Sequence, residues 1–267
     1  MDGERADLQT ADGPLDVYTY RPSSATASAT APGTVSGAGP YPGVILLMDA
    51  FGVRPELAGM ARRLASHGYV VALPNLYHRT PFAPFDPALV AAGGAERDRF
   101  KAMIATLDRD LVMRDVEAVL AQLAADPRVR AGALGVVGYC MGGGYALAAA
   151  GTFPERFAAA AIFHAGGLAT DRPDSPHTLA SAIRARVHVG AAEIDPACPP
   201  EQRERLRRAL AEAGVTHDIE VHAGARHGFA VTGHAVYDRE ASERHWSRLL
   251  QLFEEALRPA PAGTDRR

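Results

Sequence analysis

The sequence predicts an α/β fold in which helices cover both faces of a mostly parallel sheet. Short apolar runs alternate with helical segments through most of the chain, as in successive βα units. Residues 43–48 form a continuous apolar run, which is typical of a buried parallel strand. A further run, residues 134–137, leads into a glycine-rich turn and then an alanine-rich segment, which indicates strand, sharp turn and helix.

The remaining elements follow in order from the same patterns. An antiparallel pair opens the chain, because Asp12-Gly13 is a turn signal between two candidate strands. Predicted strands lie at residues 7–10, 15–20, 43–48, 69–73, 134–137, 157–163, 187–190 and 217–221. Predicted helices lie at residues 55–67, 97–107, 111–125, 201–213 and 236–257. Residues 80–94, rich in Pro, Phe and Ala, are expected to form a loop that covers a site together with the helix at 97–107.

A single domain is expected over residues 1–267, since α/β folds of this length are often undivided. Residues 23–39 are Ala, Ser, Thr, Gly and Pro without a period, and we expect a flexible surface insertion there. Residues 258–267 are expected to fray. The sequence shows no internal repeat, no Walker A pattern and no G-x-G-x-x-G, so no nucleotide site is indicated.

The composition of the chain argues against several classes of binding partner. The net charge of -3, without a basic cluster, argues against nucleic acid and anionic membrane surfaces as partners. No apolar stretch reaches the length that spans a bilayer, and the charged start of the chain lacks the apolar core of a signal peptide. Two cysteines do not make a disulfide framework. We therefore expect a cytoplasmic protein whose partner is a small molecule.

The segment from Gly138 to Gly142 has the form of a nucleophile elbow with Cys140 at its tip. Such a turn strains its central residue, so the small neighbours two positions before and two after are required. The following helix directs backbone N–H groups and its positive dipole end at the sulfur, which favours a thiolate and later an oxyanion. A glycine-flanked cysteine can also be a packing residue. The strand before it and the helix after it favour catalysis.

An elbow nucleophile needs a base and an acid that orients the base, and in this arrangement the acid and then the histidine follow the nucleophile along the chain. Asp195 follows the predicted strand at 187–190, with Glu193 as a rival two residues earlier. His227 lies in a loop after the next strand, with His222 as a rival at the strand end. We favour Asp195 and His227, because loops at the carboxyl ends of parallel strands have the freedom to reach the nucleophile.

Two further positions are candidates for the site. Asp49 directly follows a buried strand, where an unpaired charge is costly. Its loop is the one that donates the second oxyanion-hole N–H in this arrangement, so the two donors are expected to be the backbone N–H groups of Met141 and Ala50. His164 ends another predicted strand, where it either lines the pocket near the nucleophile or fills space.

Together these features resemble the dienelactone hydrolase family of α/β-hydrolases, over roughly residues 43–257. The resemblance is carried by Asp49-Ala50-Phe51-Gly52-Val53, Gly68-Tyr69, Pro74-Asn75-Leu76-Tyr77, Val137-Gly138-Tyr139-Cys140-Met141-Gly142-Gly143, the Asp195 loop, Arg226-His227-Gly228-Phe229 and Tyr237-Asp238-Arg239-Glu240-Ala241. It implies an α/β-hydrolase fold and a triad of Cys140, Asp195 and His227. It also implies hydrolysis of a lactone or ester through an acyl-thioester, with no metal or organic cofactor.

The resemblance also implies roles for residues around the triad. The acid at the position of Asp49 takes the thiol proton as substrate binds. We expect Phe51, Tyr77 and His164 to contact the substrate. Two positions depart from the family's pattern: the best-known members have Glu in place of Asp49, and they place an arginine that holds the substrate carboxylate where this chain has Val231. The candidate substitutes for that arginine are Arg226, Arg79 and Arg54.

The expected activity is therefore that of a dienelactone hydrolase-like (carboxymethylenebutenolidase-type) enzyme. A first alternative is a broader esterase, or an acyl or peptide hydrolase, on the same fold. A second alternative, of another class, is a non-catalytic or redox-sensing protein that uses Cys140. Cys198 would then be the resolving thiol, although it lies in no C-x-x-C pattern, and redox sensing needs neither Asp195 nor His227 in its place.

Overall fold

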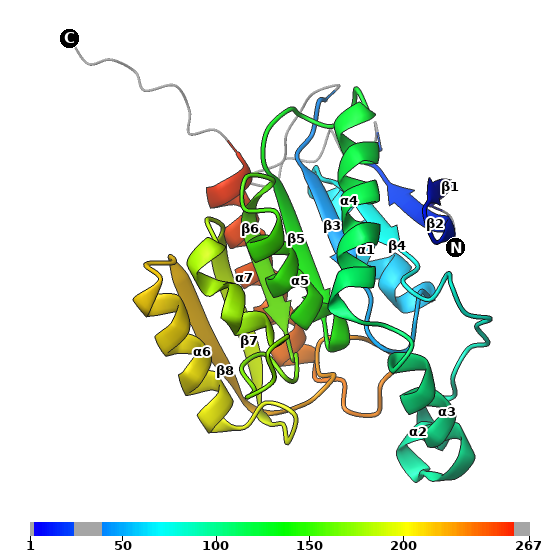
Figure 1. Ribbon diagram of the computed structural model, residues 1–267, viewed down its shortest axis with the longest axis vertical. Helices are drawn as coiled ribbons and strands as arrows, with labels where there is room; N and C mark the ends of the chain where they lie inside the picture. The colour runs from blue at the N-terminus through cyan, green and yellow to red at the C-terminus, as the bar shows by residue number, and fades with distance from the viewer. Residues whose placement is uncertain (1–2, 24–38, 259–267) are drawn as a thin grey trace.

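The computed structural model describes residues 3–23 and 39–258, and the strands of this part form one eight-stranded sheet (Figure 1). The strand order is β1-β2-β4-β3-β5-β6-β7-β8. β2 pairs antiparallel with β1 and with β4, and all other neighbours are parallel. The strands are β1 (Glu4–Thr10), β2 (Gly13–Tyr20), β3 (Gly43–Leu47), β4 (Val70–Pro74), β5 (Leu134–Tyr139), β6 (Phe157–Phe163), β7 (Arg186–Ile194) and β8 (His217–Arg226).

Helices cover both faces of this sheet, as the sequence predicts. Figure 1 shows α4, α5 and α6 in front of the sheet and α7 behind it. α1 lies beside α7, because the Arg63 guanidinium of α1 sits 4.4 Å from the centre of the Trp246 ring of α7. The helices are α1 (Pro55–Ser66), α2 (Pro87–Ala92), α3 (Gly94–Ile104), α4 (Arg109–Ala125), α5 (Met141–Thr152), α6 (Pro200–Glu212), α7 (Arg239–Leu257) and the 3₁₀ helix η2 (Pro176–Ala182).

The core lies between these layers. Every residue of β3, β4 and β5 is buried, which agrees with their continuous apolar sequences. α7 packs directly on β5, since a Cβ added at Gly135 would lie 2.9 Å from Leu257 and 3.0 Å from Phe253. No helix of the described residues is long and apolar enough to cross a membrane.

The structure differs from the sequence-based expectation at α2, at the start of α7 and at the ends of β7 and β8; α3 also spans Gly94–Ile104 rather than residues 97–107, and η2 has no predicted counterpart. The expected loop at residues 80–94 contains α2, whose N-terminus is capped by the Asp86 carboxylate through the N–H groups of Ala88 and Leu89. A helix of six residues carries too little periodicity to be found by pattern. α7 begins at Arg239 rather than at residue 236, because the Asp238 carboxylate accepts the N–H of Ala241 and caps it there.

The third difference is the length of the strands that precede the candidate site. β7 continues to Ile194 and β8 to Arg226, so both run beyond the apolar segments that predict them. The insertion expected at residues 23–39 and the tail expected at residues 258–267 lie outside the described residues, apart from Ser23, Gly39 and Arg258.

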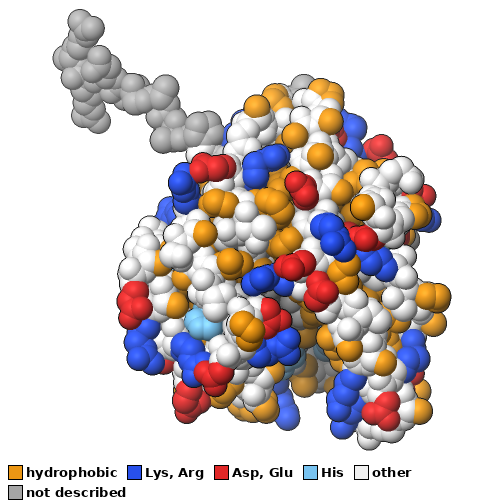
Figure 2. Space-filling model, in the orientation of Figure 1, with side chains coloured by type: hydrophobic (Ala, Val, Ile, Leu, Met, Phe, Trp, Pro, Cys, Tyr) orange, Lys and Arg blue, Asp and Glu red, His pale blue; other side chains and the backbone are white. Residues whose placement is uncertain are grey.

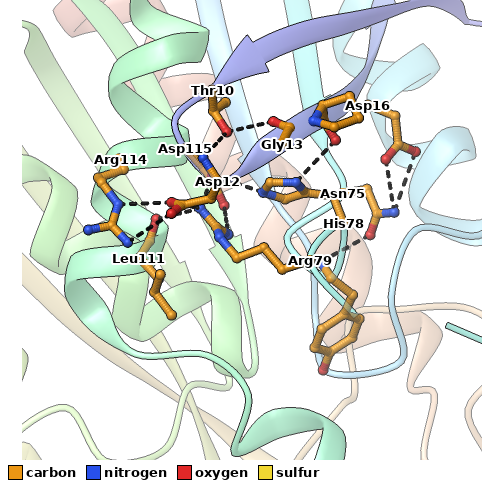
Figure 3. A network of polar contacts seen from close by, with 12 residues as sticks. Thr10, Asp12, Gly13, Asp16, Asn75, His78, Arg79, Leu111, Arg114 and Asp115 are labelled. Carbon is orange, nitrogen blue, oxygen red and sulfur yellow. Dashed lines mark hydrogen bonds and ion pairs between the residues drawn. The ribbon is translucent and has the colours of Figure 1, made fainter. Parts of the chain in front are cut away.

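The segment that follows β4 is held by a buried polar network (Figure 3). Arg79 donates hydrogen bonds to the two carboxylate oxygens of Asp115 in α4, at 2.6 and 2.8 Å, and to Asp12 in the β1–β2 turn at 3.0 Å. His78 Nε2 lies 3.1 Å from the same Asp115 carboxylate, which is fully buried. The network ties three elements together and fixes the segment that carries Tyr77.

We expect Asp115→Ala to lower the free energy of unfolding by about 3 kcal/mol or more, because it removes the buried carboxylate that Arg79 and His78 share. Urea unfolding followed by circular dichroism measures this. The control is Asp110→Ala on the same helix, whose side chain is 83% exposed, and its effect should stay within about 0.5 kcal/mol. Equal effects of the two substitutions would show that the network contributes little.

Candidate active site

Cys140 sits at a sharp turn between β5 and α5 with φ 54° and ψ -118°. This backbone conformation is unfavourable for a residue with a Cβ atom, so its surroundings must impose it. A Cβ at Gly138 would lie 2.0 Å from the carbonyl oxygen of Gly142, and one at Gly142 would lie 2.4 Å from the carbonyl oxygens of Leu47 and Met48. Both glycines are therefore required for the turn, which presents the sulfur at the carboxyl edge of the sheet.

Asp195, His227 and Cys140 form a hydrogen-bonded row at this edge. His227 Nε2 lies 3.0 Å from Cys140 Sγ, and Nδ1 lies 2.7 Å from Asp195 Oδ2. The other oxygen of Asp195 accepts the N–H of Ala197 at 2.9 Å, which orients the carboxylate. The three residues directly follow β5, β7 and β8, whose carboxyl ends meet because the strands are parallel.

The two rival residues lie elsewhere. Glu193 is still within β7, and its carboxylate accepts the N–H of Gly224 at 2.8 Å. His222 is inside β8, buried, with its ring 4.6 Å from that of Phe229. Since each strand runs further than the sequence predicts, the residue that emerges from it is Asp195 in one case and His227 in the other.

The hydrogen bonds of this row raise the pKa of His227. Burial on its own would lower the pKa of His227, but its hydrogen bonds to Asp195 and Cys140 outweigh burial and raise the pKa to about 10. The raised pKa favours the protonated ring, which donates at both nitrogens. This arrangement can hold a thiolate beside an imidazolium and later return the proton to a leaving group.

The predicted oxyanion donors are the backbone N–H groups of Met141 and Ala50. Met141 is the first residue of α5, so its N–H has no acceptor within the helix. Ala50 lies in the loop after β3, and its carbonyl oxygen accepts the Tyr77 hydroxyl at 3.0 Å. The same hydroxyl lies 3.9 Å from Met141 Sδ, so Tyr77 touches both segments. Burial raises the pKa of Tyr77, which keeps the hydroxyl a donor.

The structure places Tyr77 away from the cavity at Cys140. Its side chain is buried, stacks on Phe82 and is not among the residues that line this cavity. Its hydroxyl supports the loop of Ala50. The network of Figure 3 fixes the segment that carries it.

The Asp49 carboxylate is held by a guanidinium. Arg54 donates to its two oxygens at 2.5 and 2.7 Å, Phe51 donates its N–H at 3.0 Å, and His234 Nε2 lies 3.5 Å away. Burial alone would raise the pKa of Asp49, but His234 and Arg54 lower it to about 2. Asp49 thus stays charged, and within the described residues no hydrogen bond joins it to Cys140.

A cavity of about 680 Å³ opens at Cys140. Phe51, His164 and His227 also line this cavity, and the first two are residues that the sequence analysis expects to contact substrate. The far wall is formed by α2 and the loop between β8 and α7. Figure 2 shows the surface hollowed between the α2–α3 segment and the rest of the molecule. His234 belongs to this wall, and no motif in the sequence marks it as a site residue.

None of the expected substitutes for the carboxylate-binding arginine lines this cavity. Arg79 is bound in the network of Figure 3, and Arg54 is bound to Asp49. Arg226 is the exposed last residue of β8, and Val231 is fully buried. The lining is mainly apolar side chains, three histidines and two carboxylates.

Two other groups of reactive side chains lie outside this row. Cys198 is buried, and burial together with Asp195 raises its pKa to about 11, which makes it a poor resolving thiol. Among the described residues, one group could offer three metal ligands, at His188, Asp218 and Glu220. It lies outside the cavity at Cys140, and Arg248 binds its Glu220 at 2.9 Å.

Comparisons with known proteins show the family of this chain. The dienelactone hydrolase family matches residues 28–257. A carboxymethylenebutenolidase of Rhodococcus opacus is 30% identical, with 80% of this chain and 81% of that protein covered. A protein of Synechocystis sp. named putative carboxymethylenebutenolidase is 29% identical, with 82% of this chain and 88% of that protein covered.

Solved structures give the same result. A crystal structure named putative dienelactone hydrolase, from Klebsiella pneumoniae subsp. pneumoniae, superposes with a TM-score of 0.78 at 26% identity, covering 94% of this chain and 97% of that one. An acylaminoacyl peptidase of Pyrococcus horikoshii reaches a TM-score of 0.70 at 16% identity, with 99% of this chain and 43% of that one covered, and it shares the fold alone. The chain thus belongs to the dienelactone hydrolase family, as a hydrolase of the α/β-hydrolase fold.

Proposed function

We propose that this chain hydrolyses a small carboxylic ester or lactone, with Cys140 as nucleophile, His227 as acid and base, and Asp195 as the residue that orients His227. The observation that carries the proposal is the hydrogen-bonded row from Asp195 through His227 to Cys140. The names of the Rhodococcus and Synechocystis relatives support a lactone as the substrate class.

The reaction follows from the positions of these groups. The Cys140 thiolate attacks the carbonyl carbon, and the resulting oxyanion accepts hydrogen bonds from the N–H groups of Met141 and Ala50. When the C–O bond breaks, His227 gives its proton to the leaving oxygen and a thioester remains on Cys140. Water then attacks the thioester, His227 takes the proton from that water, and the thiolate leaves as the acid product forms.

The cavity favours substrates without a carboxylate of their own. Within the described residues the lining contains no arginine or lysine, and the nearby Arg54 guanidinium is already bound to Asp49. The α2 wall contributes Pro87, Ala88 and Val90, which suit an apolar acyl or alcohol group. We propose neutral, largely apolar lactones or esters as preferred substrates. A reducing compartment such as the cytoplasm remains the proposed location, because the nucleophile must stay a thiol.

For Asp49 the contacts favour a positioning role. Its side chain accepts the N–H of Phe51, and its own carbonyl accepts the N–H of Gly52 at 3.1 Å, so it shapes the loop that carries Ala50. The expected role as acceptor of the Cys140 proton would require it to leave Arg54 first. We therefore propose that His227, not Asp49, holds that proton.

Replacing Cys140 by Ala should lower kcat by at least ~10³-fold, the scale on which members of such triads matter. A neutral γ- or δ-lactone and p-nitrophenyl butanoate serve as substrates, with mass spectrometry to detect an acyl group on the wild-type protein. Cys198→Ala is the matched control and should keep its activity. Comparable turnover by Cys140→Ala and wild type would refute the proposed nucleophile.

The pH dependence tests His227 as the proton donor. Because its pKa is raised to about 10, kcat/KM should hold at alkaline pH and fall only as the ring loses its proton near pH 10. Asp195→Asn removes a contact that raises this pKa, so the alkaline limb should move to lower pH. Rates are corrected for spontaneous hydrolysis. Glu193→Gln should leave the limb in place, and an unmoved limb in Asp195→Asn would exclude this assignment.

Replacing Asp49 by Asn separates its two possible roles. Asn still accepts the N–H of Phe51 but loses its charge and releases Arg54. Wild type should prefer a neutral lactone to its carboxylate-bearing analogue. Asp49→Asn should reduce kcat/KM for the neutral lactone by less than about tenfold and improve the relative rate for the carboxylate. A loss near ~10³-fold for both, in a folded variant, would make Asp49 the proton acceptor instead.

A further inference from the structure

The side chain of Tyr139, the residue directly before the nucleophile, is bound by α7, which lies behind the sheet in Figure 1. Tyr139 is fully buried, and its hydroxyl oxygen lies 3.0 Å from Nε2 of His245. His245 is fully buried as well, and its ring meets the rings of Tyr139 and Phe163 edge to face, at 5.6 and 4.4 Å. The Phe163 carbonyl in turn accepts the N–H of Cys140 at 3.0 Å. One histidine of α7 thus contacts the ends of both strands that hold the nucleophile turn.

The protonation of His245 follows from its two partners. Nδ1 lies 2.7 Å from the backbone carbonyl oxygen of Ser242, which can only accept, so Nδ1 carries the proton. Nε2 is then the acceptor for the Tyr139 hydroxyl. Burial lowers the pKa of His245 to about 3, so the ring stays neutral from mildly acidic to alkaline pH. Both nitrogens of this buried ring therefore have protein partners, which makes it a fixed connection.

Ser242 joins this connection to the loop that carries the catalytic base. Its hydroxyl donates to the carbonyl of Ala230, three residues after His227, at 3.1 Å. A second hydrogen bond runs from the Asp238 N–H to the Phe229 carbonyl at 3.1 Å. The turn after His227 is therefore fixed on the start of α7, while the next turn of the same helix holds the strand of the nucleophile.

The sheet alone does not set the distance between nucleophile and base. Cys140 follows β5 and His227 follows β8, and β6 and β7 lie between these two strands. No direct pairing therefore fixes the 3.0 Å contact between Sγ and the imidazole ring. The network through α7 joins the two segments by another path. Its side chains, those of Tyr139, Ser242 and His245, are not among the residues that line the cavity at Cys140, so their effect on the reaction is indirect.

We propose that His245 is a positioning residue that, together with Tyr139 and Ser242, holds Cys140 and His227 at hydrogen-bond distance. This rests on the proposed function, because it takes Cys140 as the nucleophile and His227 as its acid and base. The network supplies a rigid connection that pairing between β5 and β8 cannot provide. Its loss should lengthen the contact between the sulfur and the ring without removing either group.

Tyr139→Phe tests this connection, because it removes one hydroxyl and keeps the ring. kcat for p-nitrophenyl butanoate should fall by about tenfold, since small displacements of catalytic groups are costly. The contact with Cys140 helps to raise the pKa of His227, so the alkaline limb of kcat/KM should move to lower pH. The side chains that face His227 are those of Cys140, Asp195 and His164, and the substitution alters none of them. A contact that serves folding alone would not move this limb.

Three further variants show whether the residues act as one path. His245→Leu removes both ring nitrogens and should cause the same fall and the same shift. His245→Gln keeps a donor and an acceptor and should restore part of kcat. The double substitution Tyr139→Phe with His245→Leu should lower kcat no further than His245→Leu alone, because both remove one contact. Ser242→Ala cuts the link to Ala230 and should move the limb in the same direction.

The matched control is His188→Leu. His188 is also a buried histidine whose ring contacts that of Phe163, at 5.6 Å. Its hydrogen bond goes to Asp218, so it joins neither Tyr139 nor the loop of His227. This variant should keep the kcat and the alkaline limb of wild type, with circular dichroism to confirm folding of every variant.

Two results would overturn the inference while leaving the hydrolase intact. One is an unchanged kcat and an unmoved limb in folded Tyr139→Phe and Ser242→Ala. The other is a fall and a shift of equal size in His188→Leu. Absence of any Cys140-dependent hydrolysis in wild type would instead overturn the proposed function and, with it, this inference.

Discussion

The close approach of α5 to the ends of β5 and β3 is the constraint on which the site depends. It exists because Gly138 and Gly142 have no side chains, so that backbone atoms of the helix meet the carbonyl groups of Leu47 and Met48. A methyl group at either glycine would push the helix off the sheet. The same contact places the first turn of α5, which begins at Met141, against the end of β3, which leads into the loop of Ala50. The strain at Cys140 and the positions of the two predicted oxyanion donors therefore have one cause.

Charges in the site are arranged as local pairs. The carboxylate of Asp195 has the His227 imidazolium, and the carboxylate of Asp49 has the Arg54 guanidinium. Each buried anion thus has its own cation within hydrogen-bond distance, which is what makes burial tolerable. The Asp49–Arg54 pair is internally balanced, so it changes the field at the sulfur little.

The sequence was most informative where local rules and topology coincide. Parallel strands end at one edge, so a nucleophile after one strand, an acid after another and a histidine after a third must come close together. Sequence patterns alone did not decide between Glu193 and Asp195 for the acid, or between His222 and His227 for the histidine. That choice is made by where β7 and β8 end, and the apolar runs end earlier than the strands do.

Other features depend on contacts between distant segments, and sequence patterns do not report them. Arg54 and His234 meet in space although 180 residues separate them. The motif that contains Tyr77 is easy to find in the sequence. The direction of the Tyr77 side chain, however, depends on its hydrogen bond to the Ala50 carbonyl. The position of His164 after a strand did not decide whether it lines the pocket or fills space. That it borders the cavity, with both ring nitrogens buried and without a partner among the described residues, depends on the packing of the surrounding rings.

The α2 wall has a consequence for how such enzymes diverge. α2 packs mainly on α3, and its Leu89 is 55% exposed, so few of its contacts reach the sheet. Substitutions there alter the shape offered to a substrate at small expense in folding free energy. The strained turn at Cys140 tolerates almost no substitution, because a Cβ at Gly138 or Gly142 would clash with backbone atoms. Substitutions in α2 can therefore change which substrates the cavity accepts, while the residues at the edge of the sheet stay the same.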